Sequence, residues 1–166
     1  MQAAETLIRL KQTGPVDARS DSQLALLARA QDQRSIAEDL AQDAVDKEVL
    51  PTMARLEATS LLAQLAFQKG DAERAVQLYR SLASEHRDAR DMFFLGLCEN
   101  NVGNVPAAIA ALEKSLEIDP AQVGPHSALR AIYQARGEQD KADAHAKAQQ
   151  QITELSEKWN QQGTQP

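Results

Sequence analysis

The chain has 166 residues, of which 43% are hydrophobic, and this is enough for one domain with a buried core. Its formal net charge of −6 argues against a nucleic-acid surface, which needs clustered cations facing phosphate. The single cysteine, Cys98, excludes an internal disulfide, and we expect it to be a small buried hydrophobe on a helix face. No apolar run approaches the roughly 20 residues that cross a bilayer.

Residues 1–53 are predicted to form a helical amino-terminal region that covers the first of the repeats described below and includes one degenerate repeat. Apolar spacing and capping residues indicate three helices: Ala3 to Gln12, a second that begins at Asp21 or Ser22 and carries Leu24, Leu26 and Leu27, and Ser35 to Glu48. The first residues lack the long apolar segment of a secretory signal. We therefore expect either a cytoplasmic protein or a periplasmic one whose leader was removed.

Residues 54–151 contain three pairs of helices, each hinged at a glycine. Gly70, Gly103 and Gly137 are 33 and 34 residues apart, and a leucine and an alanine recur in the same register. Glycine takes the left-handed conformation that ends a helix, and Asp71 and Asn104 are expected to cap the helices that follow. The leucines and alanines of this register are Leu62, Leu95, Leu129, Ala75, Ala108 and Ala142. The Gly124-Pro125 pair is predicted to form the turn before the third hairpin.

This pattern resembles the tetratricopeptide repeat between Leu56 and Gln151. The middle unit has the family's motif residues at Leu95, Gly96, Gly103, Ala108, Leu112 and Pro120. The third unit departs from the motif, because Arg130 stands where a small residue normally lets the helices touch. The resemblance implies an all-α solenoid of stacked antiparallel helix hairpins, with the additional amino-terminal region and a long carboxy-terminal helix.

The resemblance also implies that the first helix of each repeat lines a concave face where a peptide or helix of a partner protein docks. The lining positions fall on Ser60, Gln64, Phe67, Gln68, Phe93, Leu97, Asn100, Asn101, Ser127, Ala131 and Gln134. Phe67, Phe93 and Leu97 are apolar and would attract an apolar segment of the partner. The alternative is that the amino-terminal helices or the last helix fold over these side chains.

The carboxy-terminal helix is predicted to run from Glu138 to Trp159, and residues 152–166 form its end and a frayed tail. A thin stripe along this helix consists of His145, Gln149, Ile152, Leu155 and Trp159. Either the stripe packs on the third hairpin and the helix is a solvating cap, or it joins a partner or a second copy in a homo-oligomer.

No pattern of a catalytic, cofactor or metal site occurs in the chain. His86, His126 and His145 do not share a helix turn, so a metal site would have to be assembled by folding. We therefore expect no enzymatic activity, no cofactor, no metal and no membrane insertion.

The leading hypothesis is a scaffold or adaptor that binds another protein. Two other resemblances leave alternatives open. The stretch RDMFFLGLCENNVG is similar to the corresponding part of bacterial type III secretion chaperones, and LPTMARLEATSLLAQLA is similar to the segment that joins haem-binding regions to these repeats in some multihaem cytochromes. The second alternative makes this chain one portion of a larger redox protein, because no C-x-x-C-H haem motif occurs here.

Overall fold

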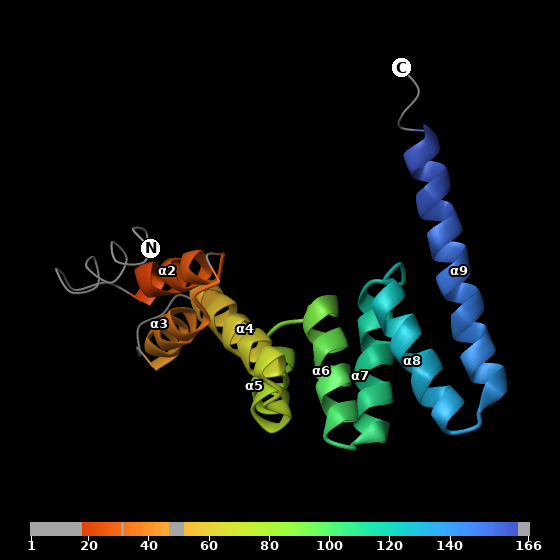
Figure 1. Ribbon diagram of the computed structural model, residues 1–166, viewed down its shortest axis with the longest axis horizontal. Helices are drawn as coiled ribbons and strands as arrows, with labels where there is room; N and C mark the ends of the chain where they lie inside the picture. The colour runs from red at the N-terminus through yellow and green to blue at the C-terminus, as the bar shows by residue number, and fades with distance from the viewer. Residues whose placement is uncertain (1–17, 31, 47–51, 163–166) are drawn as a thin grey trace. The chain divides into compact units, whose positions relative to one another are not determined.

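The computed structural model describes residues 18–30, 32–46 and 52–162, and these form α-helices without a strand. The predicted all-α fold is thereby confirmed, whereas the helix expected at Ala3 to Gln12 lies outside the described residues. The chain divides into two compact units, Met1–His86 and Arg87–Pro166 (Figure 1).

In the part that the structure describes, the first unit contains two helix pairs. These are α2 (Ala18–Ala30) with α3 (Arg34–Asp46), and α4 (Thr52–Lys69) with α5 (Ala72–Glu85). Their core combines alanines of α2 and α3 with leucines of α4, including Ala25, Ala28 and Leu61. Leu26 and Leu27, the apolar residues expected on α2, are exposed instead. The small residues Ala25 and Ala28 form the buried face because they let α2 approach its neighbours closely.

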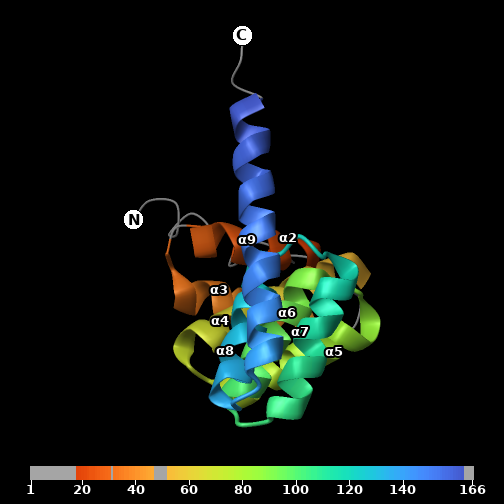
Figure 2. The same cartoon turned by 90° about the vertical axis from the view of Figure 1, so that its right-hand side faces the viewer.

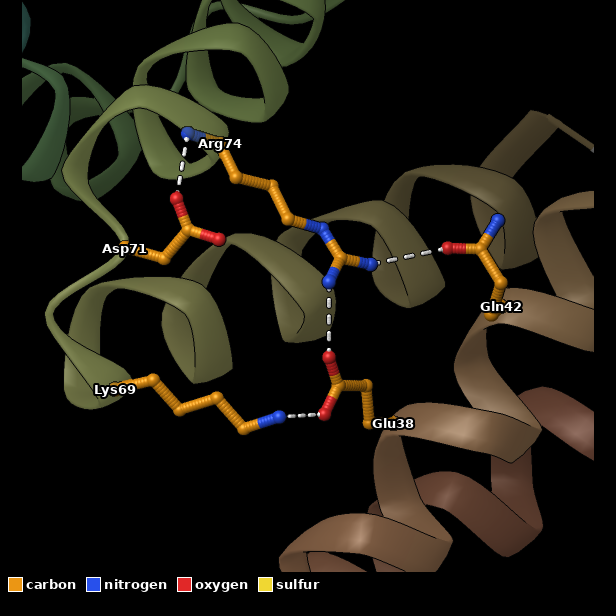
Figure 3. Close-up of polar contacts among 5 residues, drawn as sticks. All are labelled: Glu38, Gln42, Lys69, Asp71 and Arg74. Carbon is orange, nitrogen blue, oxygen red and sulfur yellow. Dashed lines mark hydrogen bonds and ion pairs between the residues drawn. The ribbon is translucent and has the colours of Figure 1, made fainter.

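An ion-pair network fastens α3 to the second helix pair of this unit (Figure 3). The Glu38 carboxylate accepts hydrogen bonds from Lys69 Nζ and from Arg74 Nη1, the latter at 3.0 Å. Arg74 Nη2 also donates to Gln42 Oε1 at 3.3 Å. The backbone amide of Arg74 donates to Asp71 Oδ1 at 3.2 Å, which confirms the predicted cap of α5.

The second unit contains α6 (Ala89–Asn101), α7 (Val105–Ile118), α8 (Val123–Ala135) and α9 (Gln139–Gln162), each packed against the next. Its core is formed by Ala108, Leu112, Leu129, Ile132, Tyr133 and Ala142. Arg130 is exposed, so its bulk does not enter the contact between α8 and α9. Figures 1 and 2 both show α9 extending beyond α8, which leaves the last turns of α9 without a helix beside them in this unit.

The turns at Gly70, Gly103 and Gly137 are equivalent. Their φ angles are 81°, 82° and 72°, and at each turn the glycine amide donates to the carbonyl three residues before it. The amide of the next residue donates to the carbonyl five residues before it, which satisfies the free carbonyls at the helix end. Five residues after each glycine stands a fully buried alanine.

The turn between α2 and α3 has the same construction with an aspartate in place of glycine. Asp32 has a φ of 57°, and its backbone amide donates to the Arg29 carbonyl. The backbone amide of Gln33 donates to the Ala28 carbonyl. Ala37, five residues after Asp32, is fully buried. A register of 33 or 34 residues misses this turn because Asp32 stands 38 residues before Gly70.

Two details of the predicted turns are wrong. Asn104 is the residue before α7, but its side chain accepts no capping bond. Its amide nitrogen instead donates to Glu99 Oε2 at 3.1 Å, because the carboxylate of Glu99 is buried and needs donors. Gly124 and Pro125 lie in the first turn of α8 rather than before it, where proline is tolerated since a first-turn amide has no partner to lose.

Candidate functional site

Phe93, one of the predicted binding residues on α6, connects α6 with α8. Its ring is half-buried, and a Cβ atom placed on Gly124 would lie 2.9 Å from it. The ring also packs against the core of the second unit and lies 5.3 Å from the ring of Phe94. Phe93 therefore contributes to the packing of this unit as well as to its surface.

The other predicted positions of the second unit lie on the same two helices, α6 and α8, and most of them are exposed. Leu97 is half-buried on α6, and the remaining five residues are exposed: Asn100, Asn101, Ser127, Ala131 and Gln134. We call these six residues together with Phe93 the α6/α8 surface. Its exposed members are amides, a hydroxyl and a methyl group, so it offers hydrogen bonds beside an apolar contact without a net charge.

The predicted positions of the first unit lie on α4. Ser60 and Gln64 are half-buried, and Gln64 Nε2 donates to Ser60 Oγ at 3.2 Å. Phe67 is half-buried and Gln68 is exposed. The aromatic ring of Phe67 is therefore accessible only in part.

The carboxy-terminal half of α9 carries large apolar side chains in contact with solvent. Leu155 is 66% exposed and Trp159 is 78% exposed, whereas His145, Gln149 and Ile152 are half-buried. Leu155 and Trp159, at the end of the predicted stripe, are therefore largely uncovered, whereas Ile152 is partly covered. An open groove of about 580 Å³ lies beside it, lined by Ala121, Val123, Ile152, Thr153, Leu155, Ser156 and Glu157.

Folding brings together two histidines that the sequence pattern left apart. His126 Nδ1 on α8 and His145 Nδ1 on α9 lie 2.9 Å from each other. The ring of Tyr133 stacks on His145 with a centroid distance of 5.7 Å and an interplanar angle of 7°. Burial and the neighbouring His126 lower the pKa of His145, and the Glu113 carboxylate partly offsets this. The two histidines are 19 residues apart and lie on different helices, so helical spacing in the sequence could not predict their contact.

Cys98 is fully buried, as expected, and burial together with the adjacent Glu99 raises the pKa of its thiol to about 11. The thiol is therefore protonated at neutral pH, whereas a cysteine that acts as a nucleophile needs to be a thiolate. Within residues 18–30, 32–46 and 52–162, no three side chains of the metal-binding types come together. No helix in that part of the chain has the length and apolarity needed to span a bilayer.

Solved structures with a similar fold cover nearly the whole chain. A structure described as "Crystal structure of MamA" superposes with a TM-score of 0.84 at 19% identity, covering 94% of this chain and 90% of that one. A MamA fragment from Desulfovibrio magneticus RS-1, described as "41-end", has a TM-score of 0.76 at 16% identity, with coverages of 95% and 85%. At these identities the similarity establishes the fold. No curated protein matches the sequence significantly.

The sequence model of the tetratricopeptide repeat matches residues 22–91 and 61–123. The two matches together span more than half of the chain. They include most of α2 and all of α3, whose turn at Asp32 repeats the geometry of the three glycine turns. This fold is that of a scaffold for protein–protein interactions. The chain belongs to the tetratricopeptide repeat family.

Proposed function

We propose that this protein is a non-enzymatic adaptor that holds a short segment of a partner protein on the α6/α8 surface. The observation that carries the proposal is the exposure of five small or polar side chains beside the half-buried Phe93 and Leu97. Asn and Gln amides donate and accept hydrogen bonds, so they suit the backbone of an extended segment, while Phe93 and Leu97 suit an apolar side chain.

The residues of α4 extend this proposal to the first unit, since Ser60, Gln64, Phe67 and Gln68 are the corresponding positions there. We further propose that residues 1–53 contribute a degenerate repeat through α2 and α3, residues 54–151 the three regular hairpins, and residues 152–166 the end of the last helix and a tail, of which 163–166 lie outside the described residues. The turn at Asp32 supports the first of these assignments. The exposed Leu155 and Trp159 support a homo-oligomer through α9 as a second mode of association.

The test places a charge in the α6/α8 surface without touching its core. Ala131 is exposed on α8, so Ala131→Glu adds a carboxylate there and leaves Phe93 in place. Partners are captured from lysate with the wild-type chain, identified by mass spectrometry, and their binding segments are prepared as peptides. For a single segment we expect a Kd on the order of micromolar. The variant should weaken binding by about tenfold or more, which corresponds to about 1.4 kcal/mol.

The matched control is Ala110→Glu, because Ala110 is also an exposed alanine within a helix of the same unit but lies on α7. Its binding should equal that of the wild type. Equal loss in both variants would indicate a general charge effect, and an unchanged Kd in Ala131→Glu would refute the α6/α8 surface. Gel filtration tests the homo-oligomer through α9. The wild type should elute as an oligomer and Leu155→Ser as a smaller species, and the proposal is wrong if both elute as monomers.

A further inference from the structure

The contact between His126 and His145 joins the last two helices through two groups that both bind protons. The nitrogens face one another at 2.9 Å, which is a hydrogen-bond distance, and the ring centroids are 5.2 Å apart. A neutral imidazole carries a hydrogen on one nitrogen and a lone pair on the other. The contact therefore requires one Nδ1 to donate and the other to accept, with one hydrogen shared between them.

This requirement fails when both rings are fully protonated. Each imidazolium carries hydrogens on both nitrogens and has no acceptor left. Two positive rings would then face each other donor to donor in a half-buried position, and this combines lost hydrogen bonding with like-charge repulsion. His126 also lies in the first turn of α8, where the helix dipole disfavours positive charge.

The charged and titratable groups around the pair leave this repulsion largely uncompensated. From α7, the Glu113 carboxylate acts on His145, but it also accepts from the Tyr133 hydroxyl at 3.5 Å. From α8, Tyr133 stacks on His145, and Arg130 is exposed. On α9 itself, Lys141 Nζ lies 4.9 Å from the centre of the Tyr133 ring, and its ammonium is paired with Glu138 at 2.6 Å. One carboxylate, Glu113, thus acts on His145 against the charge of its partner ring.

We propose that His126 and His145 form a pH-sensitive clasp, which holds α9 on α8 while the pair shares one hydrogen and opens when both rings become protonated. The clasp joins α8 near its first turn to α9, and beyond this region α9 extends past α8 (Figure 2). Opening it removes the polar contact at that end of the α8–α9 pair. The buried face formed by Leu129, Ile132 and Ala142 then becomes accessible at mildly acidic pH.

The test is amide hydrogen exchange of the full chain at about pH 7.5 and about pH 5, on either side of the ordinary histidine pKa of about 6.5. Rates are corrected for the intrinsic pH dependence of exchange, and α9 is compared with α6 and α7 of the same unit. In the wild type, exchange in α9 between Lys141 and Gln151 should become about tenfold faster at the lower pH, the factor that corresponds to one pKa unit of coupling.

In His145→Gln this acceleration should disappear, because glutamine donates and accepts hydrogen bonds but does not titrate. His86→Gln is the matched control, since His86 is exposed and belongs to the other unit, and it should keep the full acceleration. If His145→Gln fails to fold, His126→Gln tests the same contact from α8.

The proposal is overturned if α9 exchange in the wild type does not respond to pH. It is also overturned if the histidine-to-glutamine variants at positions 145 and 86 respond alike. NMR spectroscopy of the wild-type His145 ring supplies a measurement without a variant: its signals should change over the pH range in which α9 exchange accelerates, and a change outside that range would contradict the clasp.

Discussion

Gly96 provides the sharpest test of how the central hairpin is packed. It is buried on α6 where α6 crosses α7, and a Cβ atom at this position would lie 2.6 Å from Leu112 Cγ and 3.1 Å from the Ala108 carbonyl oxygen. Favourable contacts between carbon atoms need about 3.5–4.0 Å. Gly96→Ala therefore requires a displacement of about 1 Å between the helices, since Leu112 is fully buried and has no space to turn into.

The size of the effect follows from two opposing contributions. Overpacking of this kind costs about 1–3 kcal/mol. Replacing glycine by alanine within a helix raises the free energy of unfolding by about 1 kcal/mol. Gly96→Ala should thus lower the free energy of unfolding by up to about 2 kcal/mol. The net value alone is a weak test because the contributions partly cancel.

A double-mutant cycle separates them. Leu112→Ala by itself should cost about 2–5 kcal/mol through the cavity it leaves. In that background the Leu112 atoms nearest the new methyl group are gone and only the Ala108 carbonyl oxygen stays close, so Gly96→Ala should become stabilising by up to about 1 kcal/mol. Ala110→Gly, at an exposed position of α7, measures the helix contribution of glycine against alanine in this protein. Urea unfolding followed by far-UV circular dichroism gives the free energies.

The reversal of sign is the decisive result. Effects that add within about 0.5 kcal/mol would mean that Gly96 and Leu112 are not in contact, and the close approach of α6 and α7 would be refuted.

Two further predictions concern charge and reactivity. The hydrogen bond from Lys69, with the charges of Lys69 and Arg74, lowers the pKa of the Glu38 carboxyl from its ordinary 4.5. The ionised Glu38 therefore stabilises the folded state above pH 4.5, and this stabilisation is lost as the pH falls through the lowered pKa of the folded protein. Glu38→Gln should lower the free energy of unfolding by about 1 kcal/mol at pH 7, measured by urea unfolding, and should make this free energy depend less on pH in the acidic range. If the pH dependence is unchanged, other carboxylates cause it. Cys98 should not react with a thiol reagent in the native protein and should release one equivalent in denaturant, because its thiol is buried and its pKa is about 11; fast native reaction would contradict this.

The helices themselves followed from local sequence. The glycines at 70, 103 and 137 predicted where three helices end, and the structure has a left-handed glycine turn at each of them, because helix ends depend on the conformation of a few neighbouring residues. The turn at Asp32 escaped the same reasoning. Its residue is not glycine and its spacing is irregular, so only the backbone shows that it is equivalent to the others.

The candidate site was also predicted from the sequence only in part. The sequence pattern predicted which residues of α6 and α8 are available for binding, and this assignment stays a prediction, although the accessibility of Asn100 and Ala131 agrees with it. No sequence pattern indicated that Phe93 packs on Gly124, because this contact joins separate helices.

By itself, the sequence determined the helical repeat, the glycine turns and the buried alanines, since each of these depends on contacts within one hairpin. Tertiary structure alone decided that the chain forms two compact units, that Leu155 and Trp159 remain exposed, and that His126 meets His145. The physical reason is that side chains 19 residues apart have no fixed geometry until α8 and α9 pack, so no local spacing encodes their contact.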